Sequence, residues 1–252
     1  MLPTLFVAVG LLAPPRRIHL VVNPYGGGGE ASQIRDSVLP IFHAAGIEVT
    51  MLETEYAGHA QSYAETEPLL DAFIGIGGDG TAHEIANGML QRPEGERVPI
   101  GMIPAGSGNT WAFDLGLEDV ESAVDVIARG ETARVDVMAV TPTDCTVHPT
   151  PTEYAINICG YGMPAAVLEQ ANALRWLGSA QYELAGLTLI ASGRTGFSAD
   201  LEVVLEDGQT LSRVLQDASF AQAHINAHMG KRVPFAPGAK MGVHQHAVLG
   251  HT

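Results

Sequence analysis

Short apolar runs alternate with helix-like stretches along the first half of the chain. The apolar runs are rich in β-branched residues, as buried strands are, and they lie at residues 17–22, 47–52, 72–76 and 100–103. The helix-like stretches lie at residues 32–45, 60–66 and 118–128 and in the stretch that ends at Leu90. Gly46 and Gly130 stand where two of these helices are expected to end. The alternation predicts an α/β fold built on a wound parallel sheet.

The pattern changes near Arg134, where strand-like runs become more frequent. These runs lie at residues 134–140, 153–158 and 222–228, and residues 141–152 are expected to form a loop. Residues 197–205 and 212–220 alternate as a half-buried hairpin does, with Asp207-Gly208 at its tip. Residues 167–189 have helical character. We therefore divide the chain into a leader at residues 1–16, a first domain at 17–130 and a β-rich second domain at 131–252.

The leader is apolar from Leu5 to Ala13, which is too short for a membrane span. It lacks the positive start of a signal peptide, because Arg16 and Arg17 follow the apolar run. We expect an unstructured leader or a misassigned start in preference to a segment that touches a membrane, and we expect no transmembrane segment.

Unusual residues gather in the loops that follow the four strands of the first domain. These loops read NPYGGGG, TEYAG, GGDGT and PAGSGN. In a wound parallel sheet such loops meet at one edge, and glycine lets the backbone and a helix N-terminus approach a phosphate closely. Asp79 is the exception, because a carboxylate repels phosphate unless it binds Mg²⁺ or takes a proton from an attacking group. The loops therefore predict a phosphate site with an acid, Asp79, inside one of its glycine turns.

Composition narrows the possible partners. The formal net charge of -15 argues against nucleic acid and against strong attraction to anionic membranes, although it leaves room for a local basic pocket. The two cysteines indicate neither a disulfide framework nor a Cys-based zinc site, and they favour a cytoplasmic location. Five histidines near the C-terminus raise the question of a metal site, but solvated or packed histidines are the more ordinary interpretation.

Other nucleotide and nucleophile motifs fit the chain less well. Residues 75–80 match G-x-G-x-x-G, so an NAD-dependent oxidoreductase is a rival hypothesis. That signature belongs on the first strand of a dinucleotide-binding fold, whereas here it follows the third, and no acid ends a strand about 20 residues later. The sequence contains neither a P-loop nor a G-x-S-x-G elbow, and Ser107 stands in A-G-S-G.

Taken together, the four loops resemble the catalytic domain of lipid kinases, namely diacylglycerol, sphingosine and ceramide kinases. The resemblance runs from Ile18 to Lys240, and GGDG alone is shared with NAD kinases and phosphofructokinases. It implies an NAD kinase- and phosphofructokinase-like fold, with a kinase catalytic domain at 17–130 and a lipid-binding domain at 131–252. It also implies ATP and Mg²⁺, with Asp79 as the base that takes the proton of the lipid hydroxyl. The residues that the resemblance assigns to the nucleotide are Asn23, Pro24, Tyr25, Gly26, Gly27, Thr54, Glu55, Gly58, Gly77, Gly78, Gly80, Thr81, Glu84, Gly106, Ser107, Gly108, Asn109 and Arg175.

For the lipid, the resemblance points to Gly78, Asp79 and Leu168. Leu168 stands where sphingosine kinases have an aspartate that pairs with the sphingoid amine, and Gln181 stands where they have a second phosphate-contacting arginine. These departures favour a neutral lipid such as diacylglycerol or ceramide, although the GSGN loop is more similar to the sphingosine and diacylglycerol branches. A lipid substrate also implies an encounter at a membrane surface.

The tail departs from the family pattern. After Lys240-Met241 the sequence GVHQHAVLGHT does not resemble the family, whose final strands are expected to be missing or replaced. The second hypothesis is therefore a catalytically impaired member that only binds nucleotide or lipid. An NAD kinase remains a further alternative.

Overall fold

The structure, a computed structural model, describes residues 4–11, 13–106, 108–140, 152–174, 177, 180–193, 197–204, 210–224, 228–229, 233–234 and 246–251. The chain divides into two compact units. Unit 1 consists of Met1–Asn157 and Ile225–His244, and unit 2 consists of Ile158–His224 and Gln245–Thr252.

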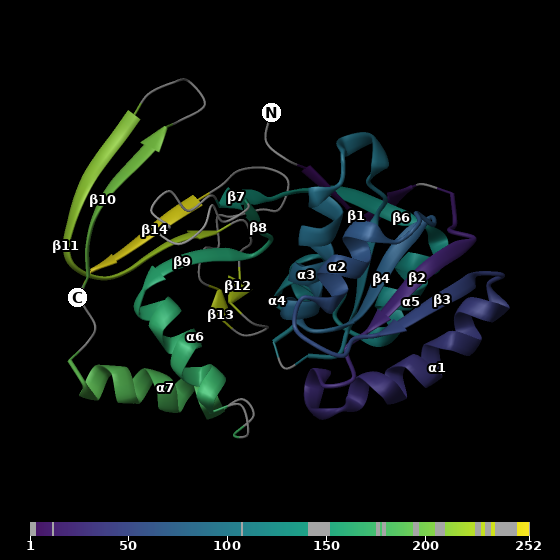
Figure 1. Cartoon of the computed structure of the whole chain (residues 1–252), viewed down its shortest axis with the longest axis horizontal. Helices are drawn as coiled ribbons and strands as arrows, with labels where there is room; N and C mark the ends of the chain where they lie inside the picture. Colours follow the sequence, from purple (N-terminus) through teal and green to yellow (C-terminus); the bar gives the residue numbers. More distant parts are fainter. Residues whose placement is uncertain are drawn as a thin grey trace. The chain divides into compact units, whose positions relative to one another are not determined.

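A six-stranded sheet forms the centre of unit 1 (Figure 1). Its strands, in spatial order, are β3 (Glu48–Glu53), β2 (Arg17–Val22), β4 (Ala72–Gly77), β5 (Ile100–Pro104), β1 (Thr4–Leu11) and β6 (Glu131–Asp136). The pairs β3–β2, β2–β4, β4–β5 and β5–β1 are parallel, and only the β1–β6 pair is antiparallel. The predicted wound parallel sheet is thereby confirmed.

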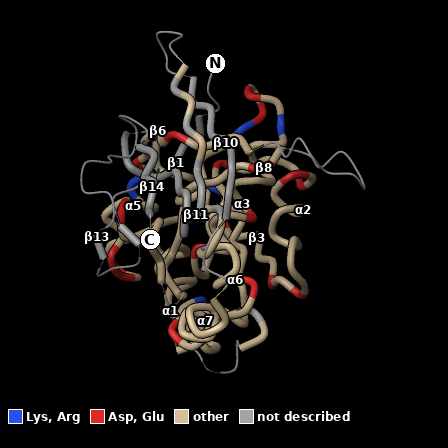
Figure 2. The backbone as a smooth tube through the Cα atoms, turned by 90° about the vertical axis from the view of Figure 1, so that its left-hand side faces the viewer, with Lys and Arg blue, Asp and Glu red and all other residues tan. Residues whose placement is uncertain are grey.

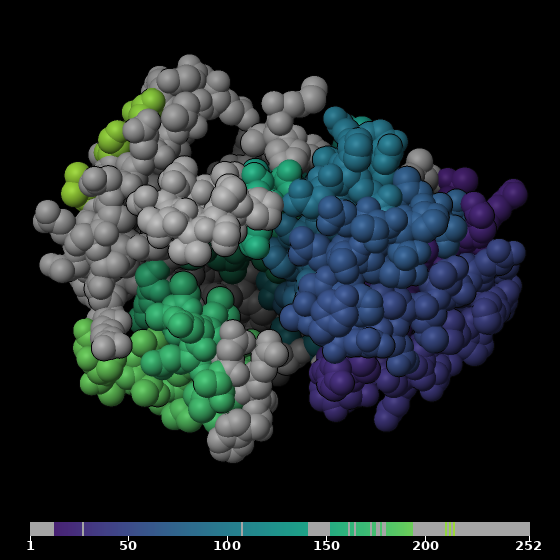
Figure 3. Space-filling view, viewed as in Figure 1, coloured from purple at the N-terminus to yellow at the C-terminus, as the bar shows by residue number. Residues whose placement is uncertain are grey.

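Helices cover both faces of this sheet. They are α1 (Glu30–Ala44), α2 (His59–Thr66), α3 (Asp79–Gln91), α4 (Thr110–Asp114) and α5 (Val120–Arg129), with short 3₁₀ turns at Gly26–Gly28 and Glu94–Glu96. One apolar cluster joins α2, α3 and α4 to the sheet, and a second joins α1 and α5 to the other face. Side chains of α1 and α2 cover much of the visible face of unit 1 (Figure 3). Because both faces are covered, successive residues of the central strands β2 and β4 are buried regardless of which face they point to.

The expected leader is instead a strand. Thr4–Leu11 forms β1, which pairs with β5 on one side and with β6 on the other. A short apolar run that ends before Pro14-Pro15 fits a strand inserted between two others as well as it fits an unstructured leader. Its two partners, β5 and β6, lie far along the chain, so no local sequence pattern indicated the pairing.

The boundary between the units also differs from the expected one near residue 130. β6 pairs with β1 and therefore belongs to the sheet of unit 1. It is followed by a two-stranded ladder of β7 (Met138–Val140) and β8 (Glu153–Ala155), which also lies in unit 1. The first unit consequently extends to Asn157.

Unit 2 combines an antiparallel sheet with two helices. The long strand β11 (Thr210–His224) pairs with β10 (Phe197–Val204), β9 (Ile158–Gly162) and β14 (His246–His251). The helices of unit 2 are α6 (Met163–Ala173) and α7 (Ala180–Ala191). β12 (His228–Met229) pairs with β13 (Val233–Pro234), and both of these strands belong to unit 1. The predicted hairpin is present as β10 and β11, while its tip at residues 207–208 lies outside the described residues. The tail that does not resemble the family supplies β14.

No helix in the described part of the chain is both long enough and apolar enough to serve as a membrane span. Acidic residues outnumber basic residues, 28 to 13. In the described residues the acidic positions are spread over several helices and loops (Figure 2).

One acidic side chain holds the start of β2. Asp71 Oδ2 accepts hydrogen bonds from the backbone N–H groups of Arg16 (2.7 Å) and Arg17 (2.9 Å). These bonds favour the ionised carboxylate and therefore lower the pKa of Asp71 below its ordinary value. The hydrogen bond from Arg16 contributes most to this shift.

Asp71→Asn should therefore lower the free energy of unfolding by roughly 0.5–1 kcal/mol at pH 7. A carboxylate with a lowered folded-state pKa stabilises the fold above the pKa of the unfolded chain. That stabilisation is lost as the pH falls through the folded-state pKa. The difference between parent and variant should thus shrink below about pH 4. Urea unfolding from pH 3 to 7 tests this, with Glu65→Gln on the exposed side of α2 as the control. A difference that persists unchanged at pH 3 would contradict the assignment.

Candidate functional site

The carboxyl ends of β3, β2, β4 and β5 meet at one edge of the sheet. The parallel register pairs Val22 with both Glu53 and Ile76, and it pairs Gly77 with Pro104. Backbone hydrogen bonds continue past the strand ends, from Asn23 N–H to the Ile76 carbonyl (3.0 Å) and from Ala105 N–H to the Gly77 carbonyl (2.9 Å). The four loops singled out in the sequence therefore begin at the same edge, as predicted.

Two of these loops touch through their backbones. A Cβ atom built on Gly106 would lie 2.5 Å from Gly78 Cα, and one built on Gly78 would lie 3.2 Å from Gly106 Cα. The first glycine loop also comes close, because a Cβ on Gly26 would lie 3.6 Å from both Gly77 Cα and the Ala105 carbonyl oxygen. Glycine at positions 78 and 106 lets two loops from distant parts of the chain pack backbone to backbone, and the first glycine loop lies within van der Waals distance of both.

Asp79 is the first residue of α3, and its half-buried carboxylate binds the start of another helix. Oδ2 accepts the Thr110 N–H (3.1 Å), and Oδ1 accepts the Trp111 N–H (2.9 Å) and the side-chain amide of Asn157 (3.3 Å). Thr110 and Trp111 open α4, whose first N–H groups have no partner inside the helix. The carboxylate is thus held in one orientation, with its charge next to the positive end of α4.

Asn23 connects the first glycine loop to α3. Its side-chain oxygen accepts the Tyr25 N–H (3.1 Å), and its side-chain nitrogen donates to Thr81 Oγ1 (3.2 Å). Thr81 is buried, and a Cβ on Gly77 would lie only 2.3 Å from Thr81 Oγ1. Pro24 is half-buried, whereas the Tyr25 side chain is 80% exposed and is available to a ligand at the rim.

Glu84, one turn further along α3, holds the loop after β3. Its two carboxylate oxygens accept the N–H groups of Gly58 (2.9 Å) and Ala60 (3.2 Å) at the start of α2. Thr54 is buried and Glu55 is exposed in the same loop. Glu84 therefore fixes the TEYAG loop through its backbone.

Asn109 closes the loop after β5 onto itself. Its side-chain oxygen accepts the Gly106 N–H (2.8 Å), and its side-chain nitrogen donates to the Gly106 carbonyl (2.7 Å). Its backbone has a φ of 51°, in the left-handed region where asparagine is among the few tolerated residues. Gly108 lies beside Asp79, since a Cβ there would be 3.1 Å from Asp79 Oδ2.

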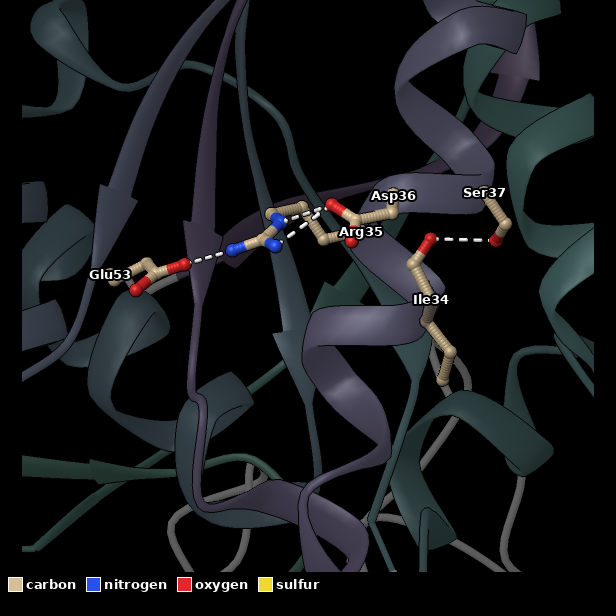
Figure 4. Close-up of polar contacts among 5 residues, drawn as sticks. All are labelled: Ile34, Arg35, Asp36, Ser37 and Glu53. Carbon is tan, nitrogen blue, oxygen red and sulfur yellow. Dashed lines mark hydrogen bonds and ion pairs between the residues drawn. The ribbon is translucent and has the colours of Figure 1, made fainter.

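The positive charge of the Arg35 side chain is balanced by two neighbouring carboxylates. Arg35 on α1 forms ion pairs with Asp36 and with Glu53 at the end of β3 (Figure 4). The hydrogen bond to Asp36 is the main reason that the pKa of Arg35 is raised. Its charge is therefore largely compensated within unit 1.

Three further predicted site residues, Ser107, Arg175 and Leu168, stay predictions. Ser107 and Arg175 lie outside the described residues. Leu168 lies on α6 in unit 2, where its side chain is 56% exposed.

Two residues that sequence analysis did not assign are part of the arrangement. Asn157 donates to Asp79, and the buried Asn87 on α3 exchanges hydrogen bonds with the backbone of Tyr154. Asn87 lies eight residues after Asp79, in the helix-like stretch that ends at Leu90, so the sequence places it on the helix that follows GGDGT. Asn157 carried no signal, because its partner is 78 residues away.

Comparison with known proteins identifies the part of the chain that carries this edge. Residues 17–140 match the family model of the diacylglycerol kinase catalytic domain. Sphingosine kinase 1 of Arabidopsis thaliana is 32% identical over 191 residues, which cover 71% of this chain and 38% of that protein. Ceramide kinase of Mus musculus is 28% identical over 201 residues, which cover 72% of this chain and 37% of that protein. The chain thus spans less than two fifths of the length of these relatives.

A solved structure supports the fold. The crystal structure of a diacylglycerol kinase from Bacillus anthracis has a TM-score of 0.68 to this chain at 22% identity. The match covers 95% of this chain and 75% of the other. At this identity the likeness shows a shared fold.

The backbone contact between Gly78 and Gly106 makes a matched pair of substitutions informative. Gly106→Ala should lower the free energy of unfolding by about 2 kcal/mol, because its Cβ would overlap backbone atoms that cannot rotate away. Gly80→Ala should change it by less than about 0.5 kcal/mol, because a Cβ there meets no atom within 4 Å. Denaturant unfolding followed by tryptophan fluorescence measures both. Equal stability of the two variants would show that the loops do not touch.

Proposed function

We propose that this chain, whose residues 17–140 match the diacylglycerol kinase catalytic domain, transfers the γ-phosphoryl group of ATP to the hydroxyl group of a lipid. The observation that carries the proposal is the setting of Asp79. It is a half-buried carboxylate at the start of a helix, with a glycine, Gly108, beside its Oδ2 atom. Phosphoryl transfer needs positioning and charge neutralisation more than covalent chemistry, which suits such a site.

The glycine loops have the space and the donors that a triphosphate requires. A Cβ on Gly28, Gly29 or Gly80 would meet no atom within 4 Å. The first N–H groups of α1 and α3 have no partner within their own helices, and a helix N-terminus favours an anion. The four loops contain no Lys or Arg. We therefore propose that the phosphates bind mainly to backbone amides at this edge.

Mg²⁺ is proposed as a partner of the ATP phosphates. Among the described residues, no three His, Cys, Asp or Glu side chains are grouped so that they could hold a metal ion. The described residues therefore do not fit a resident cation. Mg²⁺ commonly reaches phosphate-transfer sites through the substrate phosphates, where it neutralises part of their charge.

Asp79 is the proposed general base. Oδ2 accepts one hydrogen bond, which leaves one of its lone pairs for a substrate proton. In the reaction the lipid oxygen forms a bond to the γ-phosphorus, the bond from that phosphorus to the bridging oxygen of ADP breaks, and the hydroxyl proton moves to Oδ2. ADP and a lipid phosphate are the products.

A neutral lipid alcohol is the proposed substrate class. Leu168 is an exposed, uncharged residue at the position where sphingosine kinases are expected to carry an aspartate. A charged sphingoid amine would find no counter-ion in that side chain. Diacylglycerol and ceramide offer a hydroxyl group without a cation.

Asp79 has two roles in this proposal, as the general base and as the hydrogen-bond acceptor for α4. Its substitutions must separate these roles. Asp79→Asn keeps an acceptor oxygen for α4 but loses the base, and it should lower kcat by about 10²–10⁴-fold. The Kd for a non-hydrolysable ATP analogue with Mg²⁺ should stay within about threefold, as measured by calorimetry. Asp79→Ala should additionally lower the free energy of unfolding by roughly 3 kcal/mol, because charge-assisted hydrogen bonds to α4 are lost.

Asp119 provides the matched control. It also caps a helix N-terminus, by accepting the Ser122 N–H at the start of α5. Asp119→Ala should cost about 1 kcal/mol of stability and leave kcat within about twofold. If Asp79→Asn retains the parental turnover, Asp79 is only a helix cap.

The substrate is tested with radiolabelled ATP and a panel of diacylglycerol, ceramide, sphingosine and NAD in mixed micelles or solution. Labelled diacylglycerol or ceramide is the expected product. Labelled NAD would favour an NAD kinase, and intact ATP binding without any product would favour a member that only binds nucleotide.

A further inference from the structure

We infer that Asn157 is a positioning residue for Asp79, and that it determines which carboxylate oxygen receives the proton. This inference rests on the proposed function, since it concerns the proposed base. The side-chain amide of Asn157 donates to Asp79 Oδ1 at 3.3 Å, and both residues belong to unit 1.

The hydrogen bonds to Asp79 are distributed unequally between its two oxygens. Oδ1 accepts the Trp111 N–H and the Asn157 amide, which together occupy its two lone pairs. Oδ2 accepts only the Thr110 N–H among the bonds described. Gly108 faces the same oxygen, because a Cβ there would lie 3.1 Å from Oδ2. Glycine at position 108 keeps a side chain away from Oδ2, the oxygen with the fewer described hydrogen bonds, and Asn157 is the side chain that makes the two oxygens different.

A second set of contacts fixes where Asn157 lies. Gln91 on α3 donates to the Thr152 carbonyl (3.1 Å). Asn87 donates to the Tyr154 carbonyl (2.9 Å) and accepts the Tyr154 N–H (2.8 Å). The segment that contains β8 therefore runs antiparallel to α3.

The spacing of these contacts agrees with a segment that lies along a helix. Eight helical residues separate Asn87 from Asp79, which is roughly 12 Å along the axis. Three residues separate Tyr154 from Asn157, and they can span at most roughly 10 Å. β8 ends at Ala155, and the chain bends at Ile156 and Asn157. Ile156 is buried in the same apolar cluster as Ile85 and Met89, which holds this bend against α3.

The arrangement has a chemical consequence. A donor bound to Oδ1 stops the carboxylate from rotating, so that Oδ2 keeps a constant direction toward the reacting hydroxyl. Asn157 acts through Asp79, and its loss should affect the chemical step more than nucleotide binding.

Kinetics of the full chain test this role. Asn157→Ala should lower kcat for lipid phosphorylation by about 10–100-fold while the KM for ATP changes by less than about twofold. Asn157→Asp has the same shape but replaces the donor with an acceptor, so it should lower kcat at least as much. Glu65→Gln on the exposed side of α2 is the control, because this side chain contacts neither Asp79 nor the segment of β8. It should leave kcat within about twofold.

A double-mutant cycle in unfolding supplies a readout that does not need activity. The effect of Asn157→Ala on the unfolding equilibrium constant should be about fivefold smaller in an Asp79→Asn background than in the parent. If the unmutated protein has no kinase activity, the proposed function is wrong. The double-mutant cycle would still decide whether the Asn157 and Asp79 side chains are coupled. Additive effects in the cycle, or an Asn157→Ala variant with parental kcat, would overturn the inference.

Discussion

Two carboxylates on one helix hold the N-termini of two other helices, and the geometry of the site depends on this. Asp79 accepts the first N–H groups of α4, and Glu84 accepts those of α2. Each carboxylate places a negative charge at the positive end of a helix, and it accepts from donors that have no partner in their own helix. Thr81 and Asn87 on the same helix bind Asn23 and the Tyr154 backbone. α3 thus fixes the segments around it, from the loop after β2 to β8.

The sheet supplies the second constraint. Parallel register brings the ends of β2, β4 and β5 to one edge, but the loops that follow could still diverge. They stay together because Gly78 and Gly106 leave no side chain between their backbones. The proposed base therefore stands on rigid elements, and the proposed phosphate donors belong to loops that cannot separate without breaking backbone contacts. A site of this kind is prepared before its ligand arrives, which reduces the cost of ordering it.

Local patterns predicted most of unit 1. The alternation of apolar runs and helices gave the sheet, and Gly46 and Gly130 mark helix ends with positive φ as expected. The sequence could not show pairings between distant segments. β1 lies between β5 and β6, and this moved the boundary of unit 1 beyond residue 130. The role of Asn157 was invisible for the same reason, because a single asparagine in a loop has no periodic pattern. The sequence of the GGDGT loop identified Asp79 as a candidate base, but only the structure revealed that Asp79 also caps α4.

The central claim is that three glycine loops form one prepared phosphate site around Asp79. Hydrogen exchange of the full chain, followed by mass spectrometry with and without a non-hydrolysable ATP analogue and Mg²⁺, tests it most directly. The account predicts that amides in residues 26–29, 77–81 and 106–109 gain protection together, at one ligand concentration, while α7 does not change. Protection confined to one of these loops, or found only elsewhere in the chain, would contradict it.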